Sequence, residues 1–202
     1  MDAEVPLVAG SLYGLRTWTV MSDGAGEHLA APQRGTEWPP TGGWVRARCE
    51  HGHVAPAIGC RCGIHAWHPR PRAARRVLAS RFELPGIVEV QGSVEVHVDG
   101  FRAERARPYA FVRLPNRNPF LIDRLCAAYG AQVIVLRRPQ ELLELCHDRG
   151  LGLEEPVVEE LLGPEAIAGH RRAVARRRRT DRLRAAAALA TCAAGIVVTH
   201  LH

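Results

Sequence analysis

A dense cluster of cysteine and histidine restricts the fold of this sequence more than any other feature. Three of the six cysteines and four of the ten histidines fall between Cys49 and His68. They lie in Cys49-Glu-His51-Gly-His53, in Cys60-Arg-Cys62-Gly63-Ile-His65, and at His68. Zinc prefers four thiolate or imidazole ligands in a tetrahedron. The cluster therefore predicts a structural zinc site that staples this part of the chain.

Three thiolates and one imidazole form the predicted ligand set. Cys60 and Cys62 lie between Gly59 and Gly63, and glycine tolerates the positive φ that a tight turn around an ion needs. Cys49 supplies the third sulfur, and the fourth ligand is His53 or His51, with His65 as a further alternative. Three sulfurs and a histidine usually close a zinc site, which disfavours a catalytic metal. The other interpretations are reduced structural cysteines, a redox pair or a sensor thiol.

Short motifs along the first half of the chain carry a family resemblance. They are Tyr13-Gly-Leu-Arg16-x-Trp18, Trp38-Pro-Pro40, Cys49, His53-x-x-Pro56, Cys60-x-Cys62-Gly-Ile-His65-Ala66 and Gly92-x-Val94-x-x-His97-x-x-Gly100-Phe-Arg-Ala-Glu104. Together they resemble a group of uncharacterised proteins from high-GC bacteria that has no established activity. The resemblance covers roughly the first 115 residues and implies a shared N-terminal module. Within that group we expect Tyr at the position of His65, which argues against His65 as an obligatory ligand.

All 27 basic residues of the chain are arginines. The absence of lysine excludes Schiff-base chemistry and the lysine of a phosphate-binding loop. The sequence also lacks the serine elbow G-x-S-x-G, the dinucleotide motif G-x-G-x-x-G after a strand, and the zinc protease motif H-E-x-x-H. We identify no catalytic residue and no small-molecule substrate. The leading hypothesis is a non-catalytic interaction or regulatory module with a protein partner, and a Cys/His-dependent metallo- or redox enzyme is an alternative.

The fold class predicted from the sequence is α+β, and residues 1–114 are expected to form a mostly antiparallel β domain. Residues 86–98 alternate valines with polar side chains, interrupted by Gly92 as a bulge, and Asp99-Gly100 signals a hairpin turn. Strands are expected at 12–20, 44–48 and 101–114, and residues 75–84 are expected to be a strand rather than a short helix. Residues 21–43 are rich in turn formers and are expected to be a long loop.

The polar side chains of the predicted hairpin are Glu95, His97, Arg102 and Glu104. They could line a groove. The favoured interpretation is a solvated sheet face with cross-strand ion pairs.

Residues 115–163 are predicted to form a small αβα unit. Asn118 and Pro119 are typical of a helix start and Gly130 of a helix end. A buried strand is expected at 131–136, a second helix from Pro139 to Gly150, and a third from Pro156 to Gly163. Cys126 and Cys146 fall on apolar helix faces, where a buried, inert thiol is expected.

The net charge of +6 is concentrated in residues 164–184, which hold eight arginines and two acids. The remaining nineteen arginines are balanced by nineteen acids. The segment is expected to be a basic helix. It is either solvated or binds phosphate groups of nucleic acid or anionic lipid. The candidate phosphate- or lipid-binding residues are Arg171, Arg172, Arg176, Arg177, Arg178 and Arg179.

Residues 185–202 form an apolar tail whose first fifteen residues carry no charge. A helix of that length spans about 22 Å, which is less than the roughly 30 Å of a bilayer core. A packed or partner-binding helix is therefore favoured over a membrane anchor. The acidic start of the chain does not resemble a secretory signal. We expect a cytoplasmic protein, with membrane association through the tail as the alternative.

Overall fold

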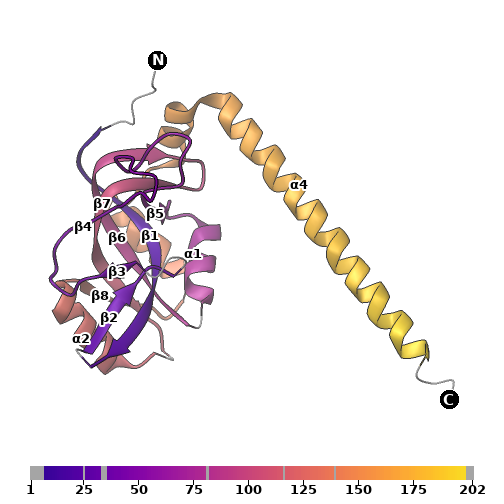
Figure 1. Cartoon of the computed structure of the whole chain (residues 1–202), viewed down its shortest axis with the longest axis horizontal. Coiled ribbons are helices and arrows are strands. Elements are labelled where there is room, and N and C mark those ends of the chain that lie inside the picture. Colours follow the sequence, from indigo (N-terminus) through magenta and orange to yellow (C-terminus); the bar gives the residue numbers. More distant parts are fainter. Residues whose placement is uncertain are drawn as a thin grey trace. The chain divides into compact units, whose positions relative to one another are not determined.

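The computed structural model confirms a mixed α+β fold (Figure 1). It describes residues 7–24, 26–32, 36–80, 82–115, 117–138 and 140–198. Within these residues, eight strands form one mostly antiparallel sheet, accompanied by four helices. The chain divides into two compact units, residues 1–158 and 159–202, which we describe separately.

Three long strands form the centre of the sheet: β1 (Leu7–Asp23), β6 (Glu83–Val96) and β7 (Gly100–Arg113). β6 pairs with both β1 and β7, and the short β5 (Ile64–Trp67) also pairs with both. These four strands therefore pair in a closed circuit. Three short strands extend the sheet beyond the circuit: β2 (Gly26–Ala30) on β1, β3 (Glu37–Trp38) on β2, and β4 (Val45–Arg46) on β7.

The predicted β6–β7 hairpin and its bulge are both confirmed. The turn is closed by the backbone N–H of His97, which donates to the carbonyl of Gly100 at 2.7 Å. The register shifts between Gln91 and Val94, and the intervening Gly92 has φ 84°. A Cβ atom at Gly92 would lie 2.5 Å from Oε2 of Glu104. Glycine is required here both for the positive φ and for this close approach.

Two apolar clusters stabilise the sheet. The first includes Trp18, whose ring meets those of Trp38 and Phe111 edge-on at 5.5 Å, and it is covered by α2 (Pro119–Tyr129). The second includes Leu15 and Ile87 and packs against α1 (Pro71–Ala79) and α3 (Gln140–Asp148). Because successive residues of a strand point to opposite faces, β1 contributes Leu15 to one cluster and Trp18 to the other.

Two sequence-based expectations about local structure were wrong. Residues 75–84 were expected to be a strand, but α1 continues to Ala79 and β6 begins only at Glu83. Ala73, Ala74 and Val77 are buried at helical spacing, which fixes this segment as an amphipathic helix. Residues 21–43 were expected to be a loop, but they contain the end of β1 and the strands β2 and β3.

The helix boundaries predicted for the αβα segment are largely confirmed. Asn118 Oδ1 accepts the backbone N–H groups of Phe120 and Leu121, and Gly130 ends α2 with φ 62°. The predicted helix start at Pro139 lies outside the described residues, and α3 is described from Gln140.

The strand of this segment, β8 (Gln132–Val135), pairs parallel with β7 and so extends the same sheet. The prediction that this strand is buried was wrong for most of its length. Val133 and Val135 are exposed, while Ile134 is buried. Parallel pairing with β7 fixes which side chains of β8 face the core, and Ile134 faces it.

The last element, α4 (Glu155–Val198), runs from the first unit into the second. Its backbone is broken at Gly163, with φ 76° and ψ 160°, directly before Pro164. This break confirms the predicted end of the third helix. None of the helices in the described part of the chain is both long and apolar enough to span a membrane.

Gly86 is a point at which the sheet admits no side chain. A Cβ atom there would lie 2.2 Å from the carbonyl oxygen of Ala110 and 2.9 Å from the Trp18 ring. We expect Gly86→Ala to lower the free energy of unfolding by at least about 2 kcal/mol, because backbone of the neighbouring strand must move. Gly24→Ala, at a position with open space, should change it by less than about 0.5 kcal/mol. Urea denaturation measures both, and equal stability of the two variants would contradict this packing.

Candidate metal centre

The candidate ligands lie on a loop that leaves and rejoins one edge of β7. β4 pairs with β7 at Ala106 and Arg105, and β5 pairs with the same strand from Ala103 to Gly100. β4 and β5 therefore lie in line along β7, with the chain between them, residues 47–63, looping outward. Because both ends of this loop are fixed by the sheet, Cys49 near its start is brought close to Cys60 and Cys62 near its end.

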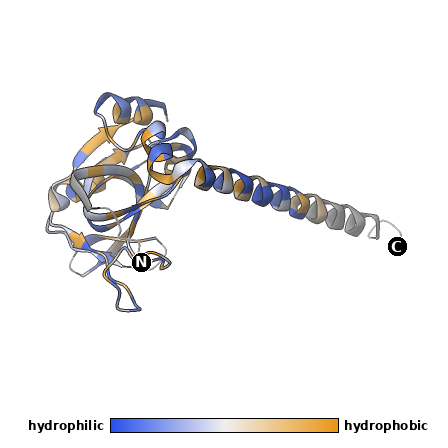
Figure 2. Ribbon diagram, turned by 90° about the horizontal axis from the view of Figure 1, so that it is seen from above, coloured by the Kyte–Doolittle hydropathy of each residue, from blue (hydrophilic) through white to orange (hydrophobic). Residues whose placement is uncertain are grey.

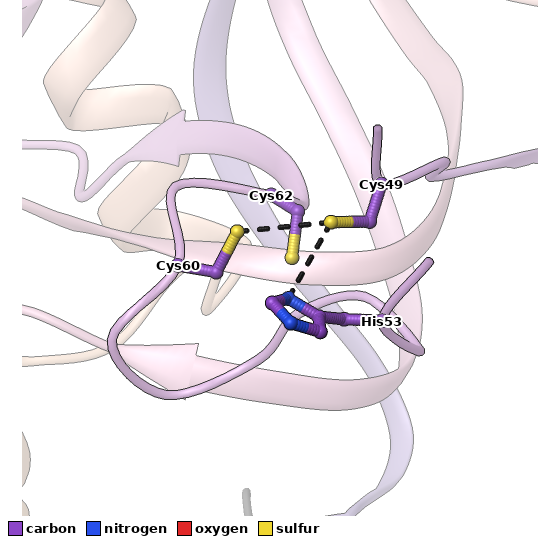
Figure 3. Close-up of side chains that lie close together, drawn as sticks. All are labelled: Cys49, His53, Cys60 and Cys62. Atoms are coloured by element: carbon purple, nitrogen blue, oxygen red, sulfur yellow. Dashed lines mark hydrogen bonds between the residues drawn. The ribbon is translucent and has the colours of Figure 1, made fainter. Parts of the chain in front are cut away.

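Four side chains of this loop converge, as Figure 3 shows. The ligand atoms of Cys49, His53, Cys60 and Cys62 all lie within 4.8 Å of one another. The Cys49 sulfur is 3.7 Å from the Cys60 sulfur and 3.5 Å from Nδ1 of His53. Zinc bonds of about 2.3 Å to sulfur and about 2.0 Å to nitrogen give tetrahedral edges of about 3.8 and 3.5 Å. The four residues could therefore hold a metal ion.

The other histidines of the cluster have different surroundings. Nδ1 of His51 is 3.9 Å from the sulfurs of both Cys49 and Cys60, so His51 lies next to the four-residue group. His65 lies on β5, and its Nε2 is 3.3 Å from the backbone oxygen of Arg61. His68 is fully buried, with Nε2 2.9 Å from the carbonyl of His97. The structure thus brings His53 to all three sulfurs and His51 to those of Cys49 and Cys60, but it does not bring His65 to them.

Burial and hydrogen bonding set the charge of the thiols. Burial acts to raise the pKa of Cys49, but the backbone N–H groups of His51 and His53 donate to its sulfur and lower the pKa to about 6. Burial raises the pKa of Cys62 above its ordinary value. Since the thiolate is the metal-binding form, Cys49 is the sulfur already prepared to bind at neutral pH.

The two thiols outside the loop whose side chains are described, Cys126 and Cys146, lack this preparation. Burial raises the pKa of Cys146 on α3 to about 11 and raises that of Cys126 on α2. Both findings agree with the expected inert thiols.

Arg102 of β7 anchors residues 47–63, the metal loop, to the sheet. Its Nη1 donates to the carbonyl oxygens of Cys60 and Cys62, the latter at 3.1 Å, and its Nη2 pairs with Glu95. Its Nε lies 3.2 Å from Nε2 of His97. The cross-strand ion pair was expected, but the solvated face was wrong for Arg102, whose residue is only 6% exposed. Sequence alone gave no sign of this anchoring role, because it depends on the register of β5 against β7.

The backbone conformation at position 63 explains why a glycine is needed directly after Cys62. Its φ is 117°, a conformation that L side chains rarely adopt. A Cβ atom would also lie 3.0 Å from that of Arg102 and 3.2 Å from that of Pro56. The chain can therefore turn from Cys62 into β5 beneath Arg102 only without a side chain at this position.

No protein-family model, curated protein or solved structure matches the chain. The resemblance to a group of proteins from high-GC bacteria therefore stays a prediction, and the candidate site rests on its own geometry.

We expect Arg102→Met to weaken metal binding by about 10- to 100-fold, the usual effect of losing a residue that orients the ligands. The variant removes the donors that hold the Cys60 and Cys62 carbonyls while leaving every candidate ligand in place. Titration with cobalt, followed by its thiolate charge-transfer absorption, measures the affinity. The control is Arg105→Met, an exposed arginine of the same strand. Equal cobalt affinities in the two folded variants would contradict the anchoring role.

Proposed function

We propose that the chain is a zinc-stabilised interaction or regulatory module without catalytic activity. The observation that carries the proposal is the convergence of Cys49, His53, Cys60 and Cys62 within 4.8 Å. Three thiolates with one imidazole favour zinc over harder cations, which prefer oxygen ligands. Four protein ligands fill a tetrahedron and leave no position for a reacting water, so the zinc is structural.

The loop that holds the zinc has little else to fix it. Of residues 47–63, Ala55, Pro56 and Cys62 are buried, and most of the others are exposed. So little apolar burial does not offset the entropy lost when a long irregular loop is ordered. A metal that joins the start of the loop to its end supplies the missing stabilisation.

The same loop presents apolar side chains to solvent. Val54 is 82% exposed and Ile58 is 53% exposed, and both lie between the candidate ligands Cys49 and Cys60. Exposed apolar side chains on a rigid loop favour recognition of another protein. This supports a protein partner for this loop.

We expect purified full-length protein to contain one zinc per chain, measured by elemental analysis. Either substitution alone, Cys60→Ser or Cys62→Ser, should abolish tight zinc binding, because the zinc would then keep only two protein sulfurs. Removing the metal with a chelator should lower the melting temperature, since binding energy at a structural site is also folding energy. Cys126→Ser, a thiol outside the loop, should keep its zinc.

Two histidine variants separate the alternatives for the fourth ligand. His53→Ala should weaken zinc binding more than about tenfold, whereas His51→Ala should have a smaller effect. The two side chains are both exposed and two residues apart, so they form a matched pair. Protein that folds stably without metal, with a melting temperature unaffected by chelation, would overturn the proposed function.

A second candidate function is polyanion binding by the basic part of α4. All eight arginines between Arg171 and Arg184 are exposed, and Figure 2 shows the predominantly hydrophilic colouring of this stretch. Arg171 pairs with Glu159 at 3.3 Å. At 100° per residue, Arg176 to Arg179 alone surround most of the helix. A helix that is cationic on every side lacks the apolar face that would lie in a membrane surface, which favours nucleic acid over lipid.

We expect the full-length protein to bind double-stranded DNA with a steep dependence on salt. Replacing Arg176, Arg177, Arg178 and Arg179 together by Gln should reduce the slope of log K against log salt by about 3 to 4, nearly one for each arginine that no longer neutralises a phosphate. Fluorescence anisotropy at several salt concentrations measures the slope. The matched control replaces Arg72 and Arg75 of α1, which are also exposed, by Gln. Binding that does not depend on salt, or an unchanged slope, would exclude this function.

A further inference from the structure

Arg16 of β1 is a buried cation in an apolar setting. Arg16 is 9% exposed and, by strand alternation, shares its face with Leu12 and Trp18 of the first apolar cluster. Among the described residues, none of the carboxylates forms an ion pair with it. Burial without a compensating charge lowers the pKa of its guanidinium to about 10. Buried charges in proteins are normally paired, and none of the described residues supplies a counter-ion for Arg16.

The hydrogen bonding of Arg16 is also incomplete. Its Nη1 donates to the backbone carbonyl of His65, and its guanidinium lies 5.1 Å from the centre of the Trp38 ring. Its Nε is buried and has no partner among the described groups. The Nε edge of a guanidinium is one of those that can donate two parallel bonds to the oxygens of a phosphate or carboxylate. Arg16 therefore keeps one buried donor, Nε, that no described group accepts.

Arg16 lines a cleft of about 820 Å³. Among the described residues, five arginines and two carboxylates, Glu83 and Asp99, line this cleft, and with Arg46 neutralised by Glu104 an excess of two positive charges is left. One of the arginines, Arg46, is already paired with Glu104 at 2.6 Å. The others are Arg16, Arg48, Arg61 and Arg76. They come from β1, the metal loop and α1, so the fold gathers positive charge from distant segments around one concavity.

Aromatic side chains form other parts of the wall. Trp67 lines the cleft, and the guanidinium of Arg76 lies 5.2 Å from the centre of its ring. Trp38 also borders the cleft, but it is only 1% exposed. Such walls can bury the organic part of a ligand while the arginines hold its charged group.

We propose that this cleft binds a small phosphate ester, with its phosphate held by the arginines of the wall, Arg16 among them, and its organic part against Trp67. The dianionic phosphate of a monoester matches the excess charge of the cleft better than a single carboxylate does. The proposal goes beyond the zinc site, which occupies a separate cavity of about 430 Å³ and shares only Arg61 and Cys62 with this cleft.

Isothermal titration calorimetry on zinc-loaded, full-length protein at constant ionic strength tests the ligand class. The probes are adenosine 5′-monophosphate, inorganic phosphate, adenosine and citrate. We expect saturable binding of the monophosphate, and adenosine should bind at least about tenfold more weakly, because it cannot pair with Arg16. Equal affinity for adenosine, tighter binding of citrate than of either phosphate probe, or no binding of either phosphate probe would overturn the proposal.

Variants locate the binding in the cleft. Arg16→Lys keeps a charge but loses the two-donor edge, and should weaken monophosphate binding about tenfold. Because a substitution of a buried residue can unfold the protein, Arg76→Gln is tested against Arg75→Gln, its neighbour on α1, which is exposed and outside the cleft. Arg76→Gln should weaken binding at least about fivefold and Arg75→Gln should not. Both retain α4 and the zinc ligands, so equal affinities in these two variants would overturn the proposal.

Discussion

Backbone pairing along one edge of β7 is the constraint on which the rest of this structure depends. β4 and β5 lie in line on that edge, and Ala47 continues the pairing by donating its N–H to the carbonyl of Glu104 at 2.7 Å. The register brings the two ends of loop 47–63 together. A slip of one residue would turn Arg102 to the opposite face and remove its bonds to Cys60 and Cys62. The sulfur geometry is thus a consequence of strand register.

Two buried arginines differ in how far the protein compensates their charge and their hydrogen-bond donors. Both lie on strands that pair with β5. Arg102 has a carboxylate partner in Glu95 and two carbonyl acceptors, so its charge and its donors are compensated within the protein. Arg16 has one carbonyl acceptor and an indole face, with a buried Nε left over. This contrast is the basis on which a ligand is proposed as the partner of Arg16.

Features encoded within a few residues could be predicted from the sequence, and features that depend on distant pairing could not. The cap at Asn118, the break at Gly163 and the bulge at Gly92 each follow from the conformational preference of one residue. The ends of α1 could not be predicted in this way. Arginines interrupt its apolar pattern, and the burial of Val77 depends on the second apolar cluster. Spacing alone proposed the three sulfurs of the candidate site, but it left His51 and His53 equivalent. Only the loop conformation distinguishes them, by placing His53 closer to Cys49.

The arginines of the cleft and those of α4 differ in the direction in which they point. This difference separates the kinds of ligand that each set would bind. Those of the cleft come from several segments and line one concavity, an arrangement that would favour a small anion by shape as well as charge. Those of α4 project from every side of one helix, where each is solvated and none shares a defined site with the next. Such an array senses charge density rather than shape, and salt screens it strongly. The two proposed binding properties are therefore separable, and only the convergent one depends on the sheet.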